Sequence, residues 1–160
     1  IRPGMNIIDM WAVPGGWSQR AQQIISKKVE VIALDILPMD PLEGVDFIQG
    51  DFREQAVMDQ LYAVLDGAPI NLVMSDMAPN MSGNKGVDQP RSIYLGELAL
   101  DTAKTVLSKD GIFLVKLFHG EGFEGFHKEV QQFFSKVVIR KPKASRPRSN
   151  EVYILAKGFK

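Results

Sequence analysis

The chain contains no cysteine, and its 160 residues carry equal numbers of acidic and basic side chains. The lack of cysteine excludes a disulfide framework and a thiolate metal site, and it favours a reducing compartment. No hydrophobic run approaches the ~20 residues that a membrane-spanning helix needs, and no signal-peptide pattern opens the chain. The histidine and carboxylate spacing suggests no metal site either. We therefore expect a cytoplasmic protein with no metal and no membrane partner.

The composition is that of a globular protein, with 45% hydrophobic and 24% charged residues. A chain of this length can form one domain with a full core. We therefore expect a single domain over residues 1–160 that acts as a monomer. Because the chain begins with Ile1 rather than methionine, we also expect that a short N-terminal segment is missing from it.

Strand-like runs alternate with helical patterns along the chain. The predicted strands are 6–10, 29–35, 45–49, 70–75, 112–117, 137–140 and 151–156. The predicted helices are 17–25, 54–65, 91–107 and 125–134, and a turn-rich loop is predicted over 77–89. This alternation predicts an α/β fold, with a mostly parallel seven-stranded sheet and helices on both faces. The last two strands have no helix between them, so they are expected to pair antiparallel.

The first predicted strand runs into the loop Pro14-Gly15-Gly16-Trp17, after which a helical pattern begins. A strand, a glycine turn and a helix N-terminus in this order form a binding site for nucleotide-like ligands in many α/β proteins. The spacing is not G-x-G-x-x-G, which argues against a nicotinamide-dependent dehydrogenase. The loop alone leaves a second interpretation open, because any strand-to-helix connection needs a turn.

Charged residues stand at the ends of the other predicted strands. Asp35 ends one of them, Asp51 and Asp76 stand just after two others, Lys116 lies near the end of a fourth, and Glu151 begins the last. Ligands of open parallel sheets bind at the carboxyl ends of the strands, where an acidic residue after the second strand often contacts ribose hydroxyls. Asp51 could equally cap a turn. Lys116 interrupts an apolar strand and therefore needs a partner or a function; Asp76 is the expected partner.

Basic residues gather near the C-terminus, where no acidic residue stands between them. They are Lys136, Arg140, Lys141, Lys143, Arg146 and Arg148. Such a run indicates a nucleic-acid-binding surface, and phosphate contacts from it would position RNA without reading its sequence. The alternative is a solvated loop.

The nonapeptide S-D-M-A-P-N-M-S-G at 75–83 resembles the signature of the FtsJ-type ribosomal RNA 2′-O-methyltransferases. Further segments resemble the same family in the same order along nearly the whole chain, at 14–19, 35–40, 49–52, 115–116, 120–123 and 151–153. The resemblance is strongest to bacterial members that act on a uridine of large-subunit ribosomal RNA. It implies a Rossmann-like methyltransferase fold and S-adenosylmethionine as cofactor, with ribosomal RNA in the large subunit as partner.

The resemblance also implies roles for individual residues. Gly15 and Trp17 would lie beside the methionine part of the cofactor, Asp35 would bind its ribose, Asp51 its adenine, and Asp76 would lie near the sulfonium.

The family's catalytic group is a lysine, an aspartate, a second lysine and a glutamate. Three of these correspond to Asp76, Lys116 and Glu151, whereas the first lysine would precede Ile1 and is absent. Lys116 is the candidate base for the ribose hydroxyl. A lysine is ordinarily protonated near neutral pH, so this role requires surroundings that favour the neutral amine.

The predicted RNA contacts are Lys143, Arg146 and Arg148. One residue departs from the family pattern, because Trp11 stands where a glycine is expected in the opening loop. Together with the absent lysine, Trp11 leaves an alternative open: a catalytically weak or inactive RNA-binding domain with the methyltransferase fold.

Overall fold

The computed structural model describes residues 6–10, 31–35, 45–50, 54–75, 85–141 and 151–160. The chain divides into two compact units, Ile1–Asp76 and Met77–Lys160. The predicted helix at 17–25 and most of the predicted loop after the fourth strand lie outside the described residues.

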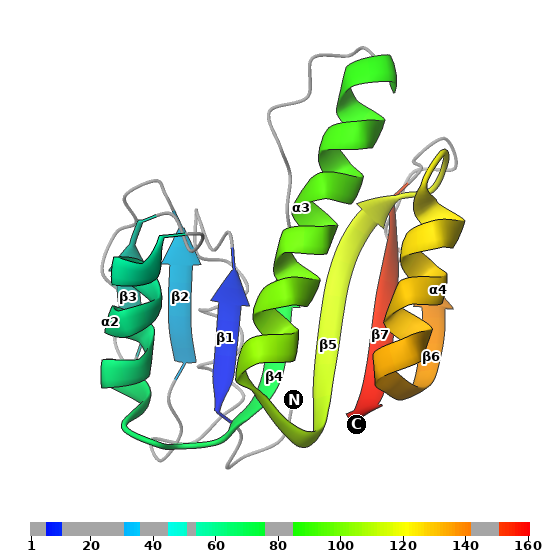
Figure 1. Ribbon diagram of the computed structural model, residues 1–160. Helices are drawn as coiled ribbons and strands as arrows, with labels where there is room; N and C mark the ends of the chain where they lie inside the picture. The colour runs from blue at the N-terminus through cyan, green and yellow to red at the C-terminus, as the bar shows by residue number, and fades with distance from the viewer. Residues whose placement is uncertain (1–5, 11–30, 36–44, 51–53, 76–84, 142–150) are drawn as a thin grey trace. The chain divides into compact units, whose positions relative to one another are not determined.

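The first unit is a parallel sheet with one described helix (Figure 1). Its strands are β1 (Ile7–Met10), β2 (Val31–Asp35), β3 (Val45–Gln49) and β4 (Ile70–Ser75), in the spatial order β3-β2-β1-β4. All three pairings are parallel, and β1 lies between β2 and β4. The predicted bounds of β3 and β4 are confirmed, as are the parallel pairings.

The middle of this unit is buried and mostly apolar, with Asp9 of β1 (1% exposed) as a buried carboxylate. All four residues of β1 are buried, as expected for a central strand of a parallel sheet. Helix α2 (Gln55–Leu65) buries Val57, Leu61 and Leu65, which stand four residues apart and therefore share one face of the helix. The helix ends where Asp66 takes a left-handed conformation (φ 46°) and donates its N–H to the Tyr62 carbonyl at 3.0 Å.

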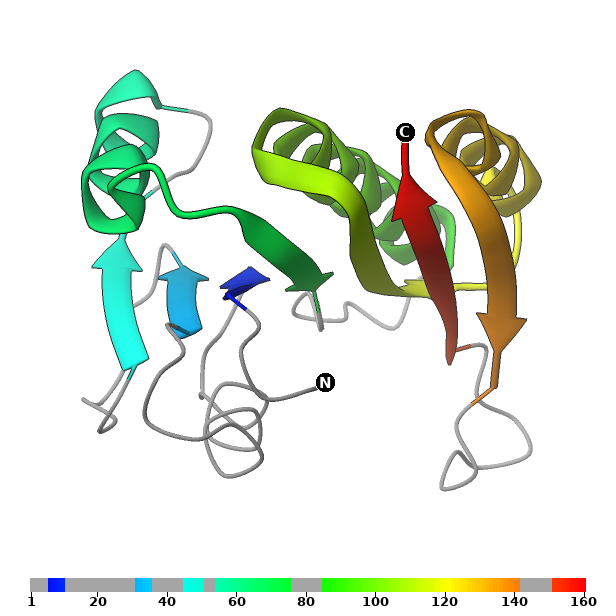
Figure 2. The same cartoon turned by 90° about the horizontal axis from the view of Figure 1, so that it is seen from below.

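The second unit pairs its strands antiparallel. It contains α3 (Lys85–Val106), β5 (Leu107–Phe118), α4 (Phe123–Phe133), β6 (Phe134–Arg140) and β7 (Glu151–Phe159). The strand order is β5-β7-β6, and β7 runs antiparallel to both neighbours. Seen from below, both helices lie on the same face of these three strands (Figure 2). The predicted antiparallel pairing of the last two strands is confirmed.

Burial alternates along β5 because successive side chains of a strand point to opposite faces. Phe113, Val115 and Leu117 are buried, whereas Leu114, Lys116 and Phe118 keep some exposure. The apolar core of this unit consists of Ala99, Leu100, Ala103, Leu107, Phe113, Val115, Leu117, Phe123, Phe126, Val130, Phe134, Val152, Ile154 and Ala156. Lys116 therefore lies on the face of β5 opposite the one that packs into this core.

Several predicted boundaries are wrong, among them the start of α4 at Phe123 rather than 125 and the end of β7 at Phe159 rather than 156. Helix α3 begins at Lys85, although residues 85–89, which include Gly86, were predicted to belong to the loop; the helix also contains Pro90. Strand β5 begins at Leu107, directly after the helix, although Asp110 keeps the positive φ (67°) of the predicted turn. Phe134 begins β6 rather than ending α4. Its ring stacks on that of Phe113, with the two ring centroids 6.1 Å apart. Within the described residues, no helix combines the length and hydropathy needed to cross a bilayer.

Candidate active site

The four parallel strands of the first unit end at one edge. Their last residues are Met10, Asp35, Gln49 and Ser75. Met10 is paired with Ser75, and Asp35 with Gln49, so the ends are aligned across the sheet. Asp35 therefore lies at the carboxyl edge, where ligands of such sheets bind. Its side chain is outside the described part of the chain, so its contact with ribose stays a prediction.

The same edge contains a buried hydroxyl. Ser75 is 0% exposed, and its Oγ has no hydrogen-bond partner among the described residues. Buried polar atoms in proteins are nearly always hydrogen-bonded. A polar group at this edge, from a ligand or from residues outside the described ranges, would satisfy the hydroxyl. This observation fits a cofactor with hydroxyl, amino and carboxylate groups.

Gly50 shapes the end of β3 just before the predicted cofactor residue Asp51. Its φ is +156°, and a Cβ at this position would lie 2.6 Å from Cγ2 of Val57 on α2. No larger residue fits without moving α2 or the strand. The Gln49-Gly50-Asp51 segment thus needs glycine to bring the chain close to the first turn of α2.

In the second unit, Lys116 and Glu151 form an ion pair. Lys116 Nζ lies 3.9 Å from Glu151 Oε1, and the side chains are 11% and 38% exposed. Lys116 comes from β5 near its end and Glu151 is the first residue of β7, so the antiparallel pairing brings them together. The expectation that Glu151 begins the last strand is confirmed. The pair gives a nearly buried amine held by a carboxylate that solvent can reach.

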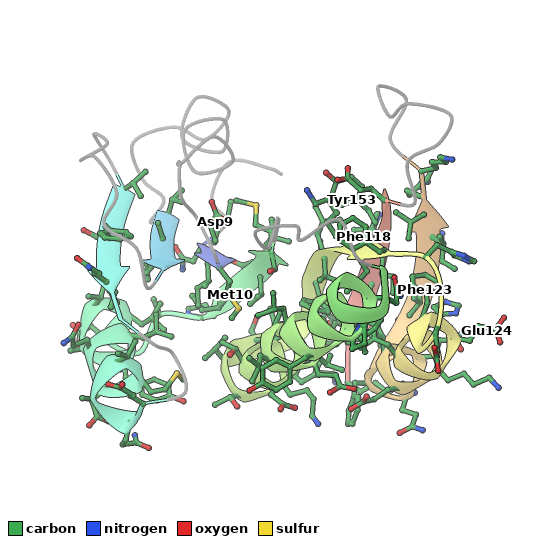
Figure 3. All side chains as sticks on the ribbon, turned by 90° about the horizontal axis from the view of Figure 1, so that it is seen from above. Asp9, Met10, Phe118, Phe123, Glu124 and Tyr153 are labelled. Carbon is green, nitrogen blue, oxygen red and sulfur yellow. The ribbon has the colours of Figure 1, made fainter. Side chains whose placement is uncertain are left out.

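Two further residues share the face of the sheet on which this pair lies. Tyr153 is directly opposite Lys116 on β7, and Arg140 of β6 is directly opposite Tyr153. Figure 3 shows Tyr153 near the start of β7 and Phe118 at the end of β5. Tyr153 was not predicted as a site residue. The sequence did contain a signal, because residues two apart in a strand face the same side and Tyr153 follows Glu151 at that spacing.

The remaining predicted residues lie outside the described ranges. They are Gly15, Trp17, Asp51 and Asp76 of the cofactor site, Lys143, Arg146 and Arg148 of the RNA site, and Trp11. The predicted contact of Lys116 with Asp76 is among them. Within the described residues, no group of three or more histidine, cysteine or acidic side chains could hold a metal ion.

The sequence matches a family model over residues 1–159, described as "FtsJ-like methyltransferase". A ribosomal RNA large subunit methyltransferase E of Cellvibrio japonicus is 57% identical over 99% of this chain and 75% of that protein. The enzyme of the same name from Alkalilimnicola ehrlichii is 55% identical over 99% of this chain and 76% of its own length.

A solved structure described as a ribosomal RNA methyltransferase of Plasmodium falciparum is also similar. It is 27% identical, covers 99% of this chain and 88% of its own, and superposes with a TM-score of 0.83. The predicted Rossmann-like methyltransferase fold, mostly parallel with an antiparallel last strand, is confirmed by this likeness and by the strand pairings. Members of the matched family use S-adenosylmethionine as methyl donor. The chain belongs to the FtsJ-like methyltransferase family.

Proposed function

We propose that the protein transfers a methyl group from S-adenosylmethionine to a ribose 2′-hydroxyl of large-subunit ribosomal RNA, at a uridine. The relatives named above, 55% and 57% identical, are called ribosomal RNA large subunit methyltransferases. The observation that carries the chemistry is the Lys116–Glu151 pair, because it supplies a nearly buried amine at a strand end. We further propose that the chain acts as a monomeric single domain in the cytoplasm, without a metal or a membrane partner.

The cofactor would be held along the carboxyl edge of the first unit. Gly15 and Trp17 are proposed to contact the methionine part, Asp35 the ribose, Asp51 the adenine, and Asp76 the region of the sulfonium. The cofactor supplies a methyl carbon made electrophilic by the positive sulfur. The chain's own part is to align the incoming hydroxyl with that carbon and to remove its proton.

Lys116 is proposed as the group that takes the proton. When bound, the cofactor would supply the methyl group, and the Lys116 amine, in its neutral form, would take the proton that the ribose hydroxyl loses. Glu151 would orient the amine through their 3.9 Å contact. Asp76 would orient the lysine or the methyl group. The low exposure of Lys116, 11%, keeps bulk water from competing for the proton.

RNA would be held by the basic residues before β7. Lys143, Arg146 and Arg148 are proposed as phosphate contacts, which supply affinity and register rather than sequence specificity. The chain joins this segment directly to Glu151. Substrate binding and the catalytic pair would therefore be linked by only a few residues.

The proposal is tested with the complete protein, S-adenosylmethionine labelled in its methyl group, and large ribosomal subunits that lack 2′-O-methyluridine. Nuclease digestion followed by mass spectrometry should find one 2′-O-methylated uridine per particle. Label on a base, or none above a protein-free control, would contradict the proposal. Calorimetry of cofactor binding then separates an enzyme from the RNA-binding alternative, since a domain without catalytic function would bind RNA but not the cofactor.

A further inference from the structure

The turn between β5 and α4 contains the segment G-E-G-F at 120–123, for which the proposed chemistry gives no role. The turn is closed by its own backbone, since Phe123 N–H donates to the Gly120 carbonyl at 3.1 Å. Gly122 has a positive φ of 86° and precedes α4 as its N-cap. The turn follows Phe118, the last residue of β5, which stands two residues after Lys116. Its shape thus bears on where the lysine is held.

The side chain of Gln89 in α3 is hydrogen-bonded to two backbone carbonyls of this turn and of the strand before it. Its side-chain Nε2 donates to the Phe118 carbonyl at 2.9 Å and to the Glu121 carbonyl at 3.0 Å. Gly120 makes room for it, because a Cβ there would lie 3.1 Å from the Gln89 Cδ. One amide therefore ties together both sides of the turn, and the glycine in the motif is what allows it to approach.

Ser92, one turn further along α3, binds the backbone N–H of Phe118, whose carbonyl is bound by Gln89. The Phe118 N–H donates to the Ser92 Oγ at 3.2 Å, and Ser92 is only 4% exposed. Both backbone groups of Phe118 are thus bound by side chains of α3. Two hydrogen bonds to one residue fix the last peptide units of β5 relative to the helix.

Phe118 is also the residue that faces Glu151 across the β5–β7 pairing. A shift of Phe118 along the strand would therefore move Lys116 and change its distance from Glu151. At 3.9 Å the Lys116–Glu151 contact is already long, so a displacement of a few tenths of an ångström would weaken it. The position of the amine depends on the two α3 side chains through the strand that carries it.

We propose that Gln89 and Ser92 are positioning residues that hold the end of β5 so that Lys116 stays aligned with Glu151. This inference rests on the proposed function of Lys116. In this account the G-E-G-F segment has a structural role, because its Gly120 leaves space for the Gln89 side chain beside the turn. Neither residue contacts the reacting atoms; both act through the backbone of Phe118.

The test replaces Gln89 by methionine, which has a similar length and no hydrogen-bond donor. For Gln89→Met we expect kcat to fall by roughly 10–100-fold, as a small misalignment of a catalytic group does. The KM for RNA and the Kd for S-adenosylmethionine should stay within about twofold of the wild-type values, since the proposal has Gln89 act only through the backbone of Phe118. Ser92→Ala is the second variant and should lower kcat in the same way. The test then still stands if one of the two variants fails to fold.

Thr102→Val is the matched control on the same helix. Thr102 is 7% exposed and donates its hydroxyl to the Leu98 carbonyl at 3.2 Å, within α3. Its replacement removes one partly buried hydrogen bond that lies within α3 and involves no atom of β5. We expect a lower melting temperature and an unchanged kcat. If Thr102→Val and Gln89→Met lose kcat equally, the effect is general destabilisation and the inference is wrong.

A double-mutant cycle with Lys116→Ala separates the two levels of the proposal. If Gln89 acts through Lys116, adding Gln89→Met to Lys116→Ala causes no further loss of the residual rate. Multiplied losses would show that Gln89 acts elsewhere and would overturn the inference. A Gln89→Met enzyme with wild-type kcat beside an inactive Lys116→Ala enzyme refutes the positioning role alone. A wild-type protein that transfers no methyl group refutes the proposed function as well.

Discussion

Lys116 and Glu151 are diagonal neighbours across two antiparallel strands, with Nζ and Oε1 3.9 Å apart. The residue directly opposite Lys116 is Tyr153, and the one opposite Glu151 is Phe118. Long side chains reach such diagonal positions on one face of a sheet. The carboxylate therefore approaches the amine from the strand end, and the tyrosine lies beside the lysine on the next strand. In the proposed mechanism this diagonal contact is the one through which Glu151 orients the amine.

Removing the charge of Glu151 while keeping its shape tests this relationship. For Glu151→Gln we expect kcat to fall roughly 10-fold, because a contact to a charged group is replaced by a weaker neutral one. The Kd for S-adenosylmethionine should not change. Steady-state kinetics and calorimetry on the same preparation measure both. Glu124→Gln, an exposed residue in the first turn of α4, is the control; equal effects of the two changes would contradict an orienting role for Glu151.

Gly50 provides a test of the first unit. Gly50→Ala places a Cβ 2.6 Å from Cγ2 of Val57, and overpacking of this kind costs about 1–3 kcal/mol. We expect the melting temperature to fall by roughly 2–12 °C, measured by circular dichroism.

Gly125→Ala, on α4, should have the opposite effect on stability to Gly50→Ala. Nothing lies within 4 Å of a Cβ added there, and alanine favours a helix over glycine by up to about 1 kcal/mol. The melting temperature should rise or stay the same. A loss of stability in this variant as large as in Gly50→Ala would mean that the steric account of Gly50 is wrong.

Trp11 is the residue that departs most from the family pattern of the opening loop, and its own position lies outside the described residues. If a backbone that favours glycine is required there, tryptophan costs roughly 1–2 kcal/mol. Trp11→Gly should then tighten S-adenosylmethionine binding by about 10-fold, as measured by calorimetry. An unchanged Kd would show that tryptophan is compatible with the cofactor at this position.

The proposed phosphate contacts predict a strong dependence of RNA affinity on salt. Each contact contributes about one to the slope of log K against log salt. Arg146→Ala and Arg148→Ala should each lower that slope by roughly 1 and weaken binding to unrelated RNA equally. Lys128→Ala, an exposed lysine on α4, should leave the slope unchanged. A flat salt response of the wild-type protein would remove the basis for the RNA surface.

Much of the fold follows from local signals in the sequence. The bounds of β3 and β4 were predicted correctly because turn residues stand directly before or after these strands. The start of α3 was not, because Gly86 and Pro90 disfavour a helix locally. The contacts of Gln89 with the turn after β5 come from residues about thirty positions later. Such tertiary contacts override propensity and leave no pattern in the helix itself.

In the candidate site, too, some features follow from local sequence signals and others depend on tertiary packing. The alternation of strands and helices predicts that Lys116 and Glu151 meet at one edge, and they do. The diagonal geometry depends on which residues of β5 oppose which of β7. That register is set by packing along the whole pairing rather than by either segment alone. For the same reason the positions of Gln89 and Ser92 could not be predicted from sequence.

The most direct test of the account is the Lys116→Ala enzyme, assayed for methyl transfer to large ribosomal subunits and, in parallel, for S-adenosylmethionine binding. Loss of a general base should lower kcat by ~10²–10⁴-fold. The Kd for the cofactor should remain nearly that of the wild type, because the amine acts on the ribose hydroxyl. Equal losses of turnover and cofactor affinity, or full turnover without the lysine, would contradict the assignment of Lys116 as the group that takes the proton.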